Sequence, residues 1–207
     1  YTYSLQKAVV FSESATVTSV SMSSVSPYTI VATAGFRLSL YDTVLYQQEP
    51  FVTRFKKPVF GATFRRDGSL IGVGGEEGKV RIFDHFSSNG GTKAALRTIK
   101  ASEAALHAVR FDCNGNGVYS LSDDGILKRW DFSQSQSSSL ASIKAHTDCA
   151  RVCVPSSLND NLVITGGFDH TVKVWDMRCD SKDKPVVELY AGFPVEAALF
   201  LPREQKV

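Results

Sequence analysis

Four polar side chains in the second half of the chain have the types and spacing of a hydrogen-bonded relay. They are His146, Thr165, Asp169 and Trp175. An indole N–H only donates, a hydroxyl donates and accepts, a neutral imidazole does both, and a carboxylate accepts. Such a series would satisfy buried polar groups and hold neighbouring strands in register. We therefore interpret the four residues as a structural tetrad rather than as a catalytic His–Asp pair.

Three other residues have the types needed for catalysis: His107, Asp123 and Asp124. The sequence contains no nucleophile elbow, phosphate-binding loop or H-E-x-x-H motif to accompany them. His107 also lies in an apolar strand context, which is typical of a packed histidine. We therefore predict that the protein is not an enzyme, with no catalytic residue, no cofactor and no small-molecule substrate.

Metal binding is the remaining chemistry to weigh. Cys149 and Cys153 are four residues apart on an expected strand, hence on one face, with His146 nearby. Zinc is one reading of this group. However, the four cysteines, which include Cys113 and Cys179, form no C-x-x-C pair. Buried thiols in a reducing compartment are the favoured reading, and no metal site is predicted.

Composition allows a sizeable core and excludes some partners. The 207 residues are 43% hydrophobic and 11% aromatic, and the formal net charge is only +2. This near-balance gives no general electrostatic argument for nucleic acid, although local patches can exist. No apolar run approaches the roughly 20 residues that span a bilayer, so no membrane partner is expected.

The elements that must position the tetrad are β-strands. Residues 162–167 and 171–175 are rich in Val, Ile and Thr, with a turn at 168–170 between them. The second run ends in Trp-Asp, which is a cue for a WD-repeat propeller blade. Similar strand ends recur at intervals of 42, 47 and 45 residues, at Asp42, Asp84, Asp131 and Asp176. WD repeats run at about 40–45 residues, so the period predicts an all-β WD40 propeller.

The repeats predict about four blades and part of a fifth, and the resemblance to WD-repeat proteins implies that the full protein closes with seven. The whole chain, 1–207, is thus one partial propeller, and residues 1–14 are an expected outer strand of a preceding blade. The expected blade ranges are 15–58, 59–102, 103–146, 147–192 and the start of another at 193–207.

Only the fourth repeat has the full tetrad. In the third, Ser120, Asp124 and Trp130 match, but Ser102 stands at the histidine position, so the tetrad is incomplete. The second repeat has Val73, Glu77 and Phe83 at the Ser/Thr, acid and Trp positions, and the first has Tyr41 in place of Trp. We expect packing rather than a polar relay to hold the second blade, and no tetrad is possible in the first.

Two surface features suggest partners. Lys56, Lys57, Arg65 and Arg66 lie on expected turns and would suit RNA phosphate, although a solvated surface is the alternative. Separately, the sequence from Trp175 to Arg178, W-D-M-R, matches the motif with which some WD proteins dock a cullin-type ubiquitin ligase adaptor. Arg178 would then be the docking residue of a ligase substrate receptor.

Several stretches together resemble the U3 small nucleolar RNA-associated protein 15 family over about residues 17–202. In chain order they are FVTRF at 51–55, ATFRRDG at 62–68, GGEEG at 74–78, HTDCARVCV at 146–154, ITGGFDHTVKVWD at 164–176 and FPVEAALF at 193–200. The serine at position 102 departs from the usual repeat pattern.

The resemblance implies a non-catalytic scaffold of the small-subunit processome in the nucleolus of the nucleus. That assembly processes pre-rRNA toward 18S rRNA and is linked to rDNA transcription. The implied partners are other processome subunits, both WD-repeat and helical proteins, with U3 snoRNA or pre-rRNA as further candidates. The resemblance also implies a complete propeller followed by a helical domain in the whole protein.

Overall fold

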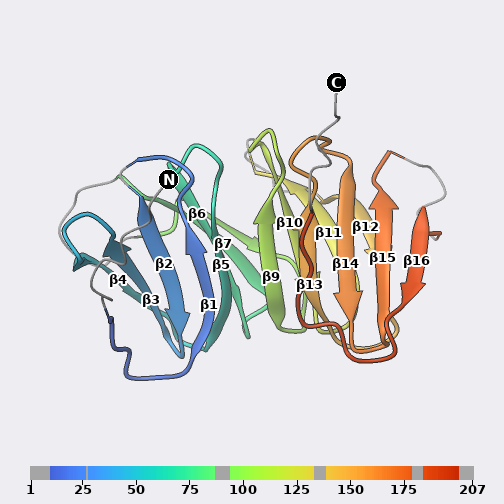
Figure 1. The fold of residues 1–207 in the computed structure, drawn as a ribbon, viewed down its shortest axis with the longest axis horizontal. Helices are drawn as coiled ribbons and strands as arrows, with labels where there is room; N and C mark the ends of the chain where they lie inside the picture. Colours follow the sequence, from blue (N-terminus) through green and yellow to red (C-terminus); the bar gives the residue numbers. More distant parts are fainter. Residues whose placement is uncertain (1–9, 27, 87–93, 133–138, 179–183, 201–207) are drawn as a thin grey trace, which may run out of the picture.

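The computed structural model describes residues 10–26, 28–86, 94–132, 139–178 and 184–200. Within these ranges the chain forms sixteen strands and four antiparallel sheets of four strands each. Each sheet is one blade, and the blades stand side by side in sequence order (Figure 1). The fold is therefore the WD40 propeller architecture that the repeat period predicts.

The strands of each blade follow one another in sequence and in space. The first blade contains β1 (Val17–Met22), β2 (Thr29–Ala34), β3 (Arg37–Asp42) and β4 (Gln47–Arg54). The second contains β5 (Val59–Phe64), β6 (Leu70–Gly75), β7 (Lys79–Asp84) and β8 (Arg97–Lys100). The third contains β9 (Leu106–Phe111), β10 (Gly117–Ser122), β11 (Ile126–Asp131) and β12 (Ser139–Lys144). The fourth contains β13 (Ala150–Pro155), β14 (Leu162–Gly167), β15 (Thr171–Asp176) and β16 (Val187–Tyr190).

The first strands of the blades, β1, β5, β9 and β13, lie next to one another along the inner side of the arc. Each carries a register shift at its second residue, so that Thr18, Phe60, His107 and Arg151 stand in a β-bulge. A bulge leaves the extra residue unpaired and re-aims its side chain. These four side chains therefore depart from the simple alternation of their strands.

The hydrophobic core lies between blades, in three layers. Leu38 and Leu40 of the first blade pack against Ile71 and Phe83 of the second. Equivalent layers join the second blade to the third and the third to the fourth. Each blade thus buries its faces against its sequence neighbours, as in other repeat architectures.

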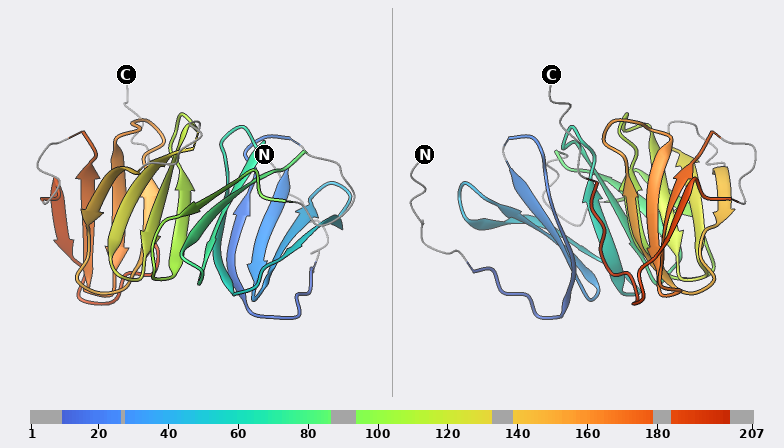
Figure 2. Two further views of the ribbon diagram at one scale, coloured as in Figure 1. Left: turned by 180° about the vertical axis from the view of Figure 1, so that it is seen from behind. Right: turned by 45° about the vertical axis from the view of Figure 1, so that its right-hand side comes forward.

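Each blade has an upper and a lower end, which carry different loops. Loops that join the first strand of a blade to the second lie at the upper end in Figure 1, and turns that join the second to the third lie at the lower end. Figure 2 shows the same arrangement from behind and from one side, with the first and fourth blades well separated. We call these the upper and lower ends.

Two expected strands differ in the structure. Residues 10–14 contain no strand, and residues 1–9 lie outside the described ranges. Residues 194–200 likewise have no strand, since the described ranges contain no further strand after them with which they could pair. Even so, the Val195 N–H donates to the Gly167 carbonyl at 3.1 Å, as Val59 N–H does to Gly35 at 2.8 Å. Val195 therefore occupies the place where a fifth inner strand would begin.

Candidate functional site: the tetrad and the charged ends

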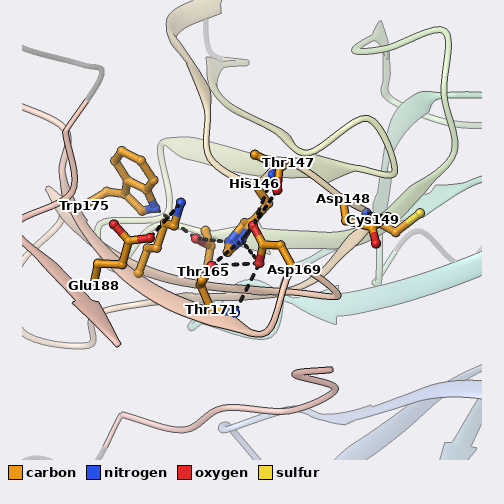
Figure 3. Close-up of polar contacts among 10 residues, drawn as sticks. His146, Thr147, Asp148, Cys149, Thr165, Asp169, Thr171, Trp175 and Glu188 are labelled. Atoms are coloured by element: carbon orange, nitrogen blue, oxygen red, sulfur yellow. Dashed lines mark hydrogen bonds and ion pairs between the residues drawn. The ribbon is translucent and has the colours of Figure 1, made fainter. Parts of the chain in front are cut away.

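The tetrad joins three segments of the fourth blade to the connection that precedes it (Figure 3). Thr165 lies in β14, Trp175 in the paired strand β15, and Asp169 in the turn between them. His146 follows β12 and enters from the connection to the next blade. The relay therefore ties this connection to the two central strands of the blade.

The hydrogen bonds run in one direction. Trp175 Nε1–H donates to Thr165 Oγ1 at 2.9 Å, and Thr165 Oγ1 lies 2.8 Å from Nε2 of His146. His146 Nδ1 lies 3.0 Å from Oδ1 of Asp169. Because the carboxylate only accepts, Nδ1 carries the imidazole proton and Nε2 accepts from the threonine. Every polar atom of the relay is thus satisfied with a neutral histidine.

Electrostatics agree with this protonation state. Burial lowers the pKa of His146, which is 1% exposed, and so favours its neutral form. Burial alone would raise the pKa of Asp169, but hydrogen bonds from Thr171, His146 and the Thr147 N–H lower it to about 2. The pair is therefore a neutral imidazole that donates to an ionised carboxylate, as a structural relay requires.

The third blade divides the same relay into two halves. Trp130 Nε1–H donates to Ser120 Oγ at 2.8 Å, and Ser102 Oγ donates to Asp124 Oδ2 at 3.0 Å. Within the described chain Ser102 and Ser120 share no hydrogen bond, since the serine side chain is too short to replace an imidazole. Ser102 nevertheless keeps the contact with the turn acid.

The second blade replaces the relay by packing and by ion pairs. Val73 and Phe83 are each 1% exposed in the core between blades. Glu77 holds the turn and lies 3.2 Å from Lys79 and 2.7 Å from Arg81. The Arg81 guanidinium in turn lies 5.2 Å from the centre of the Phe55 ring. The sequence indicates the packing but not the ion pairs.

The first blade anchors its Trp-position residue outside the blade. The Tyr41 hydroxyl donates to Glu13, and its ring centre lies 4.4 Å from that of Phe11. Burial and the contact with Glu13 raise the pKa of Tyr41 to about 12. The segment expected to form a strand of a preceding blade thus contacts the first blade directly.

His107 and Asp123 do meet, at the lower end of the arc. His107 Nε2 lies 3.1 Å from Asp123, and its ring stacks on Phe60 at 4.6 Å between centres. Burial lowers the pKa of His107. Asp124 is not part of this contact, because it accepts from Ser102 and Ser122. The stacking on Phe60 and the contact with Asp123 fit the packed histidine that the apolar strand context predicts.

The bulges also expose a feature that strand alternation does not reveal. Arg151 stands on the bulge of β13, with its guanidinium 4.7 Å from the ring centre of Phe168. The sequence could have predicted this placement of Arg151 only if the second position of each inner strand had a characteristic residue type. The four bulge residues differ in type, so the sequence gives no such signal.

Cys149 and Cys153, the two cysteines weighed as zinc ligands, differ in their surroundings, since Cys153 is buried and Cys149 is partly exposed. Cys153 is 2% exposed in the core between the third and fourth blades, and burial raises its pKa to about 12. Cys149 precedes β13, and the bulge at Arg151 interrupts the alternation that would place both thiols on one face. No group of three or more metal-ligating side chains occurs in the described ranges. Cys179 lies outside them.

The four basic residues divide into two pairs at opposite ends of β5. Lys56 and Lys57 precede this strand and Arg65 and Arg66 follow it. Lys57 lies 3.2 Å from Glu76. Arg65 donates to Asp67, with Nε at 2.9 Å, and to Ser69 at 2.7 Å. The four therefore do not make one basic patch, and two of them already have acidic partners.

Arg178 lies at the upper end after β15. Its Nε and Nη2 donate to the two oxygens of Asp176 at 3.0 and 2.7 Å, while its side chain remains 63% exposed. These hydrogen bonds lower the pKa of Asp176 to about 2. The Arg–Asp contact is thus a local pair, and no comparison with known proteins supports the adaptor alternative.

No helix in the part of the chain that the structure describes has the length and apolar character to cross a bilayer.

The match to a known family model agrees with the blades. The family model for the WD domain, G-beta repeat, matches residues 93–131 and 137–176, which cover β8 to β11 and β12 to β15. The two matched segments are therefore WD40 repeats, in agreement with the propeller fold.

Curated relatives give the particular likeness. The chain is 38% identical to the U3 small nucleolar RNA-associated protein 15 homolog of Xenopus laevis, over 90% of this chain and 34% of the relative. It is 28% identical to U3 small nucleolar RNA-associated protein 15 of Saccharomyces cerevisiae, over 92% of this chain and 36% of the relative. The resemblance found in the sequence is confirmed, although the chain spans only about a third of the length of these relatives.

Among solved structures, a chain from the crystal structure of the mitotic checkpoint complex superposes with a TM-score of 0.76. The two share 18% sequence identity, and the match covers 88% of this chain and 52% of that one. At this identity the likeness supports the fold alone.

Proposed function

We propose that the chain is the propeller part of a non-catalytic scaffold in ribosome biogenesis. The observation that carries the proposal is the likeness to U3 small nucleolar RNA-associated protein 15 over nine-tenths of the chain. The polar relay supports a structural rather than a chemical role, since its histidine is 1% exposed and neutral. We further propose that the protein belongs to the small-subunit processome of the nucleolus. There it would act in pre-rRNA processing toward 18S rRNA and in the linked rDNA transcription.

The fold suits this role because its loops are held by a rigid frame. Blade-to-blade packing fixes the positions of the loops at both ends of the arc, and loops on rigid scaffolds commonly carry binding functions. Partners are then other processome subunits, with U3 snoRNA or pre-rRNA bound directly or through them.

Co-purification of the tagged full-length protein tests the proposal. Mass spectrometry and RNA sequencing of the purified material should recover processome subunits together with U3 snoRNA and pre-rRNA. Imaging of the same tagged protein should place it in the nucleolus. Recovery of a cullin adaptor without these components, or a protein spread evenly outside the nucleolus, would overturn it. A tagged, unrelated WD40 protein processed in parallel controls for adhesion to propellers.

A further inference from the structure

A hollow of about 310 Å³ opens at the upper end, between the second, third and fourth blades. Its lining comes from the ends of the inner strands β5, β9 and β13 and from the loops that follow them. Phe64 and Phe111, each 8% exposed, form part of the wall. An apolar wall lowers the local dielectric and strengthens the interaction of any charge held there.

Two arginines line the hollow without an acidic partner among the described residues. They are Arg66, which is exposed, and Arg110, which is half-buried. Arg110 Nη1 donates to its neighbour's backbone, the Val109 carbonyl, at 3.0 Å, which leaves its other N–H groups available. The adjacent Arg65, by contrast, is neutralised by Asp67 at 2.5 Å.

The acidic groups Asp112 and Asp160 each have a partner, although Oδ1 of Asp112 is buried without a hydrogen-bond partner among the described residues. Asp112 lies 3.0 Å from Arg129. Asp160 accepts from the Cys113 thiol and, at 3.0 Å, from the Asn114 N–H. The guanidinium groups of Arg66, Arg110 and Arg129 thus carry three positive charges. The carboxylates of Asp112 and Asp160 carry two negative charges. The hollow therefore carries net positive charge although the whole chain is nearly neutral.

Ser156 adds a hydroxyl donor to the lining. Its Oγ accepts the backbone N–H groups of Leu158 and Asn159, both at 3.2 Å. The side chain is 6% exposed on a residue that lines the hollow. Because both acceptor positions are in use, the hydroxyl proton remains to be donated. A ligand with acceptor oxygens and negative charge complements this proton and the two guanidinium groups.

We propose that this hollow binds a backbone phosphate of single-stranded RNA, held by Arg66 and Arg110 with Ser156 as a further donor. The inference rests on the proposed function, which supplies RNA as the phosphate-bearing partner. Guanidinium groups match phosphate oxygens in geometry and make strong charge-assisted bonds with them. A concave site walled by three blades suits a strand that can bend into it, whereas a rigid duplex presents its phosphates along a convex cylinder. The contact fixes position and carries no base specificity.

RNA binding by the full-length protein tests the site. Fluorescence anisotropy with a labelled short single-stranded RNA would be measured over a range of salt concentrations. The double variant Arg66→Ala with Arg110→Ala should bind about tenfold more weakly. The slope of log affinity against log salt should become shallower by about one unit for each phosphate that the variant no longer neutralises. Arg97→Ala is the matched control, because Arg97 is an exposed arginine on β8.

Three results would overturn the proposal: no RNA binding by the wild type, equal binding by the double variant, or an equal loss of affinity in the Arg97 control. Stronger displacement by an acidic polypeptide than by unlabelled RNA would assign the hollow to protein instead. Should the double variant unfold, ultraviolet crosslinking of the wild type to RNA gives an independent test. Crosslinked peptides should then include residues 63–66, 110–113 or 155–157, and crosslinks confined to other segments would contradict the site.

The proposed function and this site fail separately. If the scaffold role holds and the hollow does not bind RNA, the wild-type protein still co-purifies with processome subunits while its affinity for the oligonucleotide does not depend on Arg66 and Arg110. If the scaffold role fails, co-purification is lost whatever the oligonucleotide shows.

Discussion

Ser102 Oγ lies 3.0 Å from Asp124 Oδ2, and this bond takes the place in the third blade that the His146–Asp169 contact has in the fourth. The serine keeps the turn acid bonded but does not reach the strand hydroxyl. One blade therefore has a continuous relay from turn to tryptophan, and its neighbour has two separate bonds. This difference allows the contribution of the continuous relay to stability to be measured within one chain.

Replacing Thr165 by valine should destabilise the chain by about 2–4 kcal/mol, because it leaves two buried polar groups without a hydrogen-bond partner. Trp175 would lose its acceptor and His146 its donor, at distances of 2.9 and 2.8 Å. Ser120→Ala in the third blade leaves only the Trp130 N–H without its partner, so the loss of stability should be about half as large. Chemical denaturation of both variants gives the comparison. Equal losses of stability would show that the continuous relay adds nothing beyond separate bonds.

Trp175→Ala should cost about 3–5 kcal/mol, the usual loss of stability for a large buried aromatic side chain. Trp175 is 2% exposed and packs in the core between the third and fourth blades. Trp175→Phe keeps most of that packing and removes the single N–H donor, so its destabilisation should be clearly smaller. Thermal melts check both variants. An unchanged melt for the alanine variant would contradict the burial.

Acidification from pH 7 to pH 5 should lower the melting temperature. Burial lowers the pKa of His146 in the folded chain, while the unfolded histidine titrates near pH 6.5. The unfolded state therefore takes up a proton first, and stability falls as pH falls below about 6.5. His107 contributes in the same direction, since burial also lowers its pKa.

The variant His107→Gln separates the two histidines. It should reduce the pH dependence between pH 7 and pH 5 but not remove it, and the remainder belongs to His146. A second decrease in stability should follow between about pH 4 and pH 2, as the Asp169 carboxylate with its pKa of about 2 becomes protonated. A melting temperature that rises or stays constant down to pH 5 would contradict the neutral, buried histidine.

The spacing of strand ends is enough to predict the four blades, because each blade repeats the same local pattern of strand, turn and strand. The tetrad is equally readable, since Thr165, Asp169 and Trp175 lie close together in sequence. Contacts between blades are not readable in this way. The stack of His107 on Phe60 joins residues of two repeats, and no sequence interval fixes which side chains meet across that interface.

The basic residues illustrate the same limit. Lys57 and Arg65 are eight positions apart in sequence, yet one strand places them at opposite ends of a blade. Arg66 and Arg110 are far apart in sequence and line one hollow. Proximity along the chain therefore misleads the grouping of charges, while proximity across inner strands defines it.

Gly125→Ala should be much more damaging than Gly192→Ala, although both glycines have positive φ, of 73° and 79°. A Cβ at Gly125 would lie 2.2 Å from the His146 carbonyl oxygen, whereas nothing lies within 4 Å of a Cβ at Gly192. Gly192→Ala should therefore lose only the roughly 1–2 kcal/mol of left-handed strain. Gly125→Ala adds a backbone clash that should cost about 1–3 kcal/mol more, because the same carbonyl belongs to the residue that enters the tetrad. Equilibrium unfolding of the two variants measures the difference. Equal destabilisation would show that the connection before the fourth blade can shift freely, and the relay would then not depend on a fixed position of His146.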